Sequence, residues 1–239
     1  MNGRVLHFYL AGINNQNFLM RDKETGTWWQ QITGKAIYGP LRGASLELVA
    51  SDELTFGEWK SEVSDGRVLA EVPKYKKEYD SNWEPEVAKL PVVISFPGTE
   101  LKSRDVVVGL EIDGASRAYP WETLLKQSPV MDRVHGTPVL IVVGPDRKSF
   151  RVFVSRIDGQ DAEFFLKGES EPTQSTSTAG EPPAVAGATR PRAPSTNPWS
   201  LLDATTGPAQ GKCLDHVPAL KDYWFDWRNY HPDTTIYKR

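Results

Sequence analysis

The sequence predicts an α+β fold that is mostly β, with short helices and one and a half copies of a related β-rich repeat unit. Three observations favour this fold class: several short β-branched and aromatic runs, few helical patterns, and an internal repeat. The chain has 239 residues, of which 39% are hydrophobic and 25% are charged. Such proportions are typical of a globular protein and exclude a wholly disordered chain, a collagen-like fibre and a disulfide-rich miniprotein.

Sequence patterns typical of β-strands are more frequent along the chain than helical patterns. Most of the β-branched and aromatic runs are bounded by glycine, proline, aspartate or asparagine, which favour turns. Asp113-Gly114 lies between two extended stretches and predicts a tight hairpin turn. The predicted strands are 5–11, 106–112, 138–143 and 150–155.

Helical patterns are few and short. Thr55 and Glu58 have the spacing of a capping box, which predicts a helix that begins near Trp59. Further helices are expected at 121–126, directly after Pro120, and at 222–230.

An internal repeat indicates the domain organisation. Residues 39–69 align with residues 207–237 without a gap, and chance would produce only about two identities in such a window. The identical pairs are Gly39/Gly207, Pro40/Pro208, Gly43/Gly211, Leu46/Leu214, Val49/Val217, Trp59/Trp227 and Asp65/Asp233. We therefore expect a partial first unit at 1–90 and a second unit at 91–239.

Each unit should contain a helix with an aromatic face. Phe56 and Trp59 are three residues apart, as are Trp224 and Trp227, so each pair shares one helix face. We expect this face to pack on the sheet, because a buried indole removes a large apolar area from water.

A segment of biased composition interrupts the second unit. Residues 169–198 contain six prolines and no aromatic residue. Such a segment cannot bury enough apolar surface to offset the entropy lost on ordering. A disordered loop is therefore predicted at 169–198.

Three segments resemble a bacterial family known as the domain of unknown function 3179 family. They are Asn17–Leu46, with its Gly-x-Ala-Ile-x-Gly-Pro-Leu-x-Gly pattern, Val108–Pro120 and Trp224–Thr234. The resemblance implies two related halves, of which the first usually holds a Trp-His-Glu element and a Cys-Pro-x-Cys element suited to metal or redox chemistry. This sequence contains neither element. The resemblance therefore implies an N-terminally truncated member of the family.

The same resemblance points to Asp22, Trp29 and Gln31 as ligand-binding candidates, since they fall on the polar and aromatic positions of its motif. On a strand, Trp29 and Gln31 would project to the same face and could line a ligand groove. The alternative is a packed indole together with an amide that serves the turn backbone.

No catalytic residue, metal site or cofactor is predicted. The four histidines, His7, His135, His216 and His231, have no metal-ligand spacing. Cys213 is the only cysteine, so neither an intrachain disulfide nor a thiolate cluster can form. The sequence also lacks a nucleophile elbow, a phosphate loop and a dinucleotide-binding fingerprint.

Charge and hydropathy restrict the expected partners. Lys and Arg number 28 against 31 Asp and Glu, and this net charge of −3 argues against nucleic-acid binding. No run approaches the roughly 18 apolar residues of a membrane span, and the N-terminus does not have the pattern of a signal peptide. The sequence does not indicate the cellular compartment of the protein. An edge strand at 5–11 predicts self-association, because an unpaired edge is a template for another chain.

Three functions are compatible with these observations. The leading hypothesis is a non-catalytic binding or scaffold module, because no catalytic constellation is recognisable. One alternative is an enzyme or a metal or redox protein whose active first half is missing from this chain. The other is a carbohydrate-binding module that uses Trp28, Trp29 or Trp83.

Overall fold

The computed structural model describes residues 3–164 and 214–238, and it confirms the mostly-β, α+β class. The described strands form four sheets, one of them a two-stranded ribbon, and the helices are short. The loop predicted at 169–198 and Cys213 lie outside the described residues. Within the described ranges, no helix is both long enough and apolar enough to cross a membrane.

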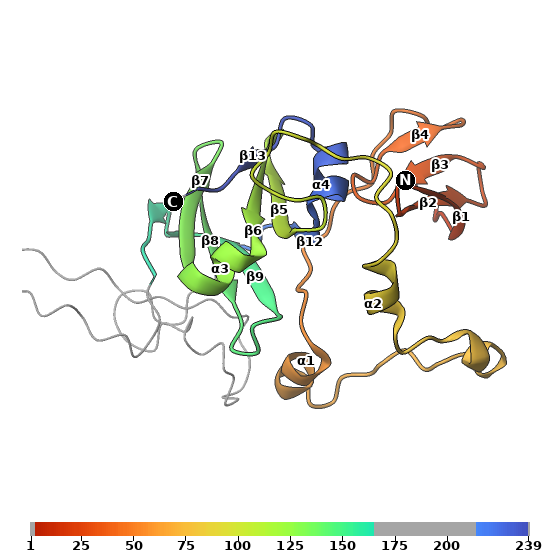
Figure 1. Ribbon diagram of the computed structural model, residues 1–239, viewed down its shortest axis with the longest axis horizontal. Helices are drawn as coiled ribbons and strands as arrows, with labels where there is room; N and C mark the ends of the chain where they lie inside the picture. The colour runs from red at the N-terminus through yellow and green to blue at the C-terminus, as the bar shows by residue number, and fades with distance from the viewer. Residues whose placement is uncertain (1–2, 165–213, 239) are drawn as a thin grey trace, which may run out of the picture.

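Four antiparallel strands form the N-terminal sheet in the order β1-β2-β3-β4 (Figure 1). They are β1 (Phe8–Asn14), β2 (Asn17–Asp22), β3 (Trp28–Gln30) and β4 (Ala36–Tyr38). Asn15 and Gln16 connect β1 to β2 with φ values of 49° and 69°, the positive angles that a two-residue type I′ hairpin requires. The strand predicted at 5–11 is β1, displaced toward Asn14.

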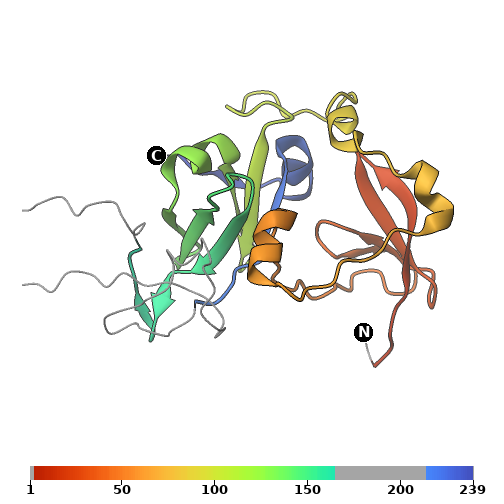
Figure 2. The same ribbon diagram turned by 90° about the horizontal axis from the view of Figure 1, so that it is seen from below.

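A long connecting segment follows, and Figure 1 shows it looping away below the sheets, whereas Figure 2 views the same segment from below. It holds α1 (Phe56–Glu62), the 3₁₀ helix η1 (Pro73–Glu78) and α2 (Trp83–Val87). The predicted N-cap is confirmed, since the Thr55 hydroxyl accepts a 3.4 Å hydrogen bond from the backbone N–H of Glu58. The Thr55 backbone N–H donates to the Ser149 hydroxyl at 2.9 Å, in place of the Glu58 side chain that a reciprocal capping box would use. Neither α1 nor η1 contains a buried residue.

Polar contacts fasten the start of the connecting segment to the rest of the protein. The guanidinium of Arg151, which is buried, lies 3.0 Å from an oxygen of Asp52 and 2.7 Å from an oxygen of Glu62. The Thr55 hydroxyl donates to Asp146 at 2.7 Å. Polar side-chain contacts, rather than a buried apolar helix face, therefore hold α1 in place.

The C-terminal body consists of two larger sheets with α3 and α4. One sheet has the strand order β12-β5-β6-β13, and the other has the order β7-β8-β9. The elements are β5 (Val106–Ile112), β6 (Ala115–Pro120), α3 (Trp121–Gln127), β7 (Val130–Val134), β8 (Thr137–Val143), β9 (Phe150–Val154), β10 (Arg156–Ile157), β11 (Gln160–Asp161), β12 (Ala219–Tyr223), α4 (Trp224–Tyr230) and β13 (Thr235–Ile236). The hairpin predicted at Asp113-Gly114 joins β5 to β6, and both of its turn residues have positive φ.

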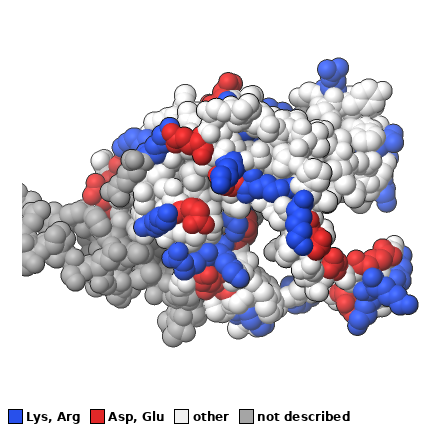
Figure 3. Space-filling model, in the orientation of Figure 1, with Lys and Arg blue, Asp and Glu red and all other residues white. Residues whose placement is uncertain are grey.

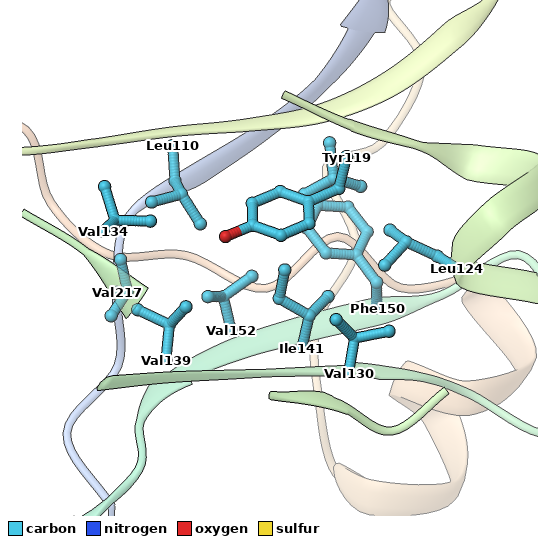
Figure 4. Close-up of a cluster of buried hydrophobic side chains, with 11 residues drawn as sticks. Leu110, Tyr119, Leu124, Val130, Val134, Val139, Ile141, Phe150, Val152 and Val217 are labelled. Atoms are coloured by element: carbon cyan, nitrogen blue, oxygen red, sulfur yellow. The ribbon is translucent and has the colours of Figure 1, made fainter. Parts of the chain in front are cut away.

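The main apolar core lies between these two sheets (Figure 4). Tyr119 occupies its middle, among aliphatic side chains that both sheets contribute. Strand β5 is buried on both faces, because Val108 and Leu110 enter this core while Val107 packs with Trp224 and Trp227 of α4. The body is thus layered, with α4 covering the outer face of β5.

The aligned helices α1 and α4 share a local conformation but differ in burial. Their C-cap residues, Val63 and His231, have φ/ψ values of −122°/73° and −127°/69°. Trp224 and Trp227 are buried, whereas Phe56 is 63% exposed. Packing of the aromatic face on a sheet is therefore confirmed for α4 and wrong for α1, and the repeat itself stays a prediction.

Candidate functional site

Two of the three predicted ligand residues contact each other inside the N-terminal sheet. The Trp29 indole Nε1–H donates a 2.8 Å hydrogen bond to Oδ2 of Asp22, and both residues are fully buried. Oδ1 of Asp22 accepts bonds from the backbone N–H and the hydroxyl of Thr25, at 2.6 and 2.8 Å. Burial opposes ionisation of Asp22, but the bonds from Trp29 and Thr25 outweigh it and lower the pKa of Asp22. This carboxylate therefore closes the turn after β2 and orients the indole.

The third predicted residue, Gln31, lies apart from this pair. It is exposed and follows the last residue of β3, Gln30. Because the strand ends there, the alternation of side chains along β3 does not extend to Gln31. The structure thus brings Asp22 and Trp29 together and leaves Gln31 at the surface.

Gln30, which sequence reasoning missed, begins a buried chain of polar side chains. Its Nε2 donates to Oδ1 of Asn17 at 2.9 Å, and Nδ2 of Asn17 donates to Oδ2 of Asp226 at 3.1 Å. Its Oε1 accepts a 2.6 Å bond from the backbone N–H of Thr33. With both ends of the Gln30 amide engaged, Asn17 is oriented toward α4. This series of hydrogen-bonded side chains connects the N-terminal sheet to the C-terminal body.

This chain ends at two carboxyl groups, Asp226 in the first turn of α4 and Asp222 near the end of β12. One oxygen of each has a partner: Oδ1 of Asp222 accepts the Tyr223 backbone N–H at 2.7 Å, and Oδ2 of Asp226 accepts from Asn17. The other two oxygens, Oδ2 of Asp222 and Oδ1 of Asp226, are buried and lack a donor when both groups are ionised. A single proton held between the two carboxyl groups satisfies both oxygens.

The direction of the pKa shifts of both groups agrees with a shared proton. Burial is the main reason that the pKa of Asp222 is raised, and the negative charge of Asp226 adds to the effect. Burial also raises the pKa of Asp226, although the hydrogen bond from Asn17 opposes this. Two carboxyl groups in such contact titrate as a unit. The site can therefore hold and release a proton at a buried contact between two parts of the protein.

The tip of the β1–β2 hairpin, Asn14–Asn17, forms the other side of this contact, which we call the joint. Asn14 donates to the Tyr230 hydroxyl at 3.2 Å, and Gln16 accepts from the Arg104 guanidinium at 3.2 Å. That guanidinium also lies over the Tyr223 ring, 5.1 Å from its centroid. The joint therefore comprises the hairpin tip, the two aspartates, Tyr230 and Arg104.

A sequence signal for the joint existed but was incomplete. Asp222 and Asp226 are four residues apart at a strand-to-helix boundary, a spacing that can bring two carboxyl groups together. Their partner Asn17 is 209 residues away from Asp226. Nothing in the local pattern of either segment reveals that they meet.

Three of the four histidines, His7, His216 and His231, make structural contacts. The His231 ring stacks on the Trp227 ring with centroids 3.7 Å apart, and Nδ1 of His7 lies 2.6 Å from a carboxylate oxygen of Glu24. Within residues 3–164 and 214–238, no three His, Cys, Asp or Glu side chains converge in the way that a metal site needs.

Surface charge is mixed over the face of the molecule that Figure 3 shows, where acidic and basic side chains are interspersed. This distribution matches a formal net charge of only −3. On that face, charged ligands of either sign would meet both attractive and repulsive groups.

Comparison with known proteins identifies the family. No curated protein and no solved structure matches the chain. The family model described as "Protein of unknown function (DUF3179)" matches residues 2–234, nearly the whole chain. The resemblance carried by the Gly-Pro-Leu motif and the C-terminal Trp-rich helix is thereby confirmed, and the chain belongs to the DUF3179 family.

Proposed function

We propose that the chain is a non-catalytic binding or scaffold module whose first 93 residues present apolar surface to a partner. One observation carries the proposal. Among the described residues, every large apolar side chain that is substantially exposed lies between Val5 and Val93, except Met131. The C-terminal body, by contrast, buries most of its large apolar side chains in three hydrophobic clusters. Apolar exposure concentrated in one part of a chain marks an interaction site.

One face of the N-terminal sheet is the binding surface that we propose for this partner. Its strand register places Leu10 opposite Met20 and Ile13 opposite Phe18, so these side chains share one face of the sheet. Leu10 is 59% exposed and Ile13 is 64% exposed. We call this surface the apolar face. Covering it would remove several large side chains from water, each worth roughly 1.5–3 kcal/mol when fully buried.

The adjoining sheet edge favours a second copy of the chain as the partner. Strand β1 lies at the end of the sheet order and pairs with β2 on one side. Its residues, Phe8–Asn14, include no charged side chain and no proline, which are common protections of an exposed edge. Antiparallel pairing of two β1 strands would continue the sheet and set two apolar faces side by side. This is the self-association that the sequence predicts for 5–11.

Sedimentation velocity across a wide range of protein concentrations tests the proposal. The wild-type chain should associate as its concentration rises, and Ile13→Glu should stay monomeric because it places a charge on the apolar face. Met131→Glu, a matched change at the exposed apolar side chain of the body, should associate like the wild type. A wild-type protein that remains monomeric at every concentration would contradict self-association.

A carbohydrate-binding role is the second candidate. Trp83 on α2 is 56% exposed, and Trp28 is half-buried with the Arg21 guanidinium over its ring. Trp29 is fully buried and has no surface to stack on a sugar. Tryptophan fluorescence that does not respond to soluble oligosaccharides would remove this candidate. The enzyme alternative depends on sequence elements that this chain does not contain.

A further inference from the structure

We infer that Asp222 and Asp226 form a proton-operated latch, which holds the tip of the β1–β2 hairpin against α4 and releases it when the pair loses its shared proton. The latch has two states. In the docked state, one proton lies between the two carboxyl groups and Asn17 bonds to Asp226. In the released state, both carboxylates are ionised and hydrated, and the hairpin tip has withdrawn from α4.

The geometry makes the docked state depend on this proton. Asp226 is 6% exposed, and its Oδ1 and the Oδ2 of Asp222 lack any donor other than the shared proton. Without that proton, two carboxylates would both be ionised with a buried, unpartnered oxygen on each, which is unfavourable. The hairpin tip covers Asp226 through Asn17. Withdrawal of the tip is therefore the movement that would let water solvate Asp226.

The charged side chains around Asp222 and Asp226 do not neutralise the two carboxylates in place of the shared proton. Lys221, next to Asp222 in the chain, lies 2.9 Å from an oxygen of Glu53, and the negative charge of Glu53 also disfavours ionisation of Asp222. Arg104, on the loop before β5, is engaged with the hairpin tip and the Tyr223 ring.

The remaining charged groups near the pair are also engaged elsewhere. On α4, Arg228 donates to the Thr234 carbonyl and His231 stacks on Trp227. Asp105 accepts from the Lys102 backbone. The hairpin tip itself, Asn14–Asn17, carries no charge. Within the described residues, no cation forms an ion pair with either carboxylate of the latch.

Other polar groups in the joint would gain from release. Asn15 is buried, and neither its Nδ2 nor its Oδ1 has a hydrogen-bond partner. Nη1 of Arg104 is likewise buried without a partner. Buried polar atoms without partners are costly, and water would satisfy them once the tip withdraws. Hydration of these atoms therefore offsets part of the cost of breaking the joint.

Hydrogen exchange of the full chain, read by mass spectrometry, tests the latch. The readout is the protection factor of a peptide that covers β1 and β2, corrected for the intrinsic pH dependence of exchange, from mildly acidic to alkaline pH. Protection of the wild-type hairpin should fall at least tenfold as the pH rises through the titration of the pair, because deprotonation releases the tip. Protection of a peptide that covers β8 and β9 should stay constant, since the core remains folded.

Asp222→Asn is the decisive variant. In this variant, the side-chain oxygen at position 222 can still accept from the Tyr223 backbone N–H. The new amide N–H₂ at the same position can donate to Asp226 at every pH, in place of the shared proton. Hairpin protection in Asp222→Asn should therefore be independent of pH. Asp233→Asn, which changes an exposed carboxyl group after α4, should respond to pH like the wild type.

Asp226→Asn gives a second reading if Asp222→Asn does not fold, and it should also abolish the pH response. The latch is overturned if wild-type hairpin protection does not change with pH. It is equally overturned if the asparagine variant retains the wild-type response, or if β8 and β9 lose protection together with the hairpin.

Discussion

The indole of Trp227 lies directly against the backbone of Gly109. A Cβ atom at Gly109 would come within 2.4 Å of three ring atoms of Trp227, closer than non-bonded atoms allow. The indole Nε1–H donates to the Thr234 hydroxyl at 3.0 Å, which holds the ring in place. Helix α4 can therefore lie this close to β5 only because the strand has no side chain at this position.

This contact predicts a specific sensitivity to small substitutions. Gly109→Ala should lower the free energy of unfolding by about 1–3 kcal/mol, since either the ring or the strand must move. Urea denaturation measures the effect. Gly57→Ala is the matched control, because an added Cβ there meets no atom within 4 Å and alanine favours the helix. Equal stability of Gly109→Ala and the wild type would mean that α4 does not pack on β5 in this way.

The Asp22–Trp29 hydrogen bond predicts both a loss of stability and a pH dependence. Asp22→Ala should lower the free energy of unfolding by about 1–3 kcal/mol, because the buried indole N–H loses its acceptor. The pKa of Asp22 is lowered in the folded protein. Its contribution is therefore fully present above the pKa of the unfolded chain, about 4, and is lost as the pH falls toward the folded value.

Denaturation at several acidic pH values measures this contribution. Asp22→Asn should show a weaker loss of stability on acidification than the wild type, because the titrating group is gone. Asp65→Asn, a change at an exposed aspartate after α1, should leave the acid dependence intact. A wild-type acid profile in Asp22→Asn would show that Asp22 does not titrate in this range.

The ion pairs of Arg151 predict what holds α1 to the C-terminal body. Arg151→Met keeps much of the buried side-chain volume but removes the contacts with Asp52 and Glu62, so the attachment of α1 should weaken by roughly 3 kcal/mol. Limited proteolysis should then cut the connecting segment near α1 faster than in the wild type. Arg156→Met, which removes a more exposed pair with Asp161, should be cut at the wild-type rate. Unchanged cleavage in Arg151→Met would place the attachment elsewhere.

Part of the candidate site could be predicted from local sequence, and part could not. The motif that points to Asp22 and Trp29 does mark two residues that contact each other, but as a buried structural pair. The family resemblance points to Gln31, and side-chain alternation places Gln31 on the face of Trp29 only if the strand continues past Gln30. The strand ends at Gln30, where the backbone turns back toward β4. The Gln30 amide donates to Asn17, and Asn17 in turn donates to Asp226 of α4.

By itself, the sequence determined the local elements of this protein: the Asp113-Gly114 hairpin, the Thr55 cap, and the mostly-β class with its short helices. These depend on neighbouring residues, whose turn chemistry and side-chain alternation act over a few positions. Only the tertiary structure decided that Trp227 is buried while Phe56 is exposed, since burial depends on whether a sheet lies opposite the helix. It also decided that Asp226, which is buried beside Asp222, meets Asn17, and desolvation of that kind arises only when distant segments pack together.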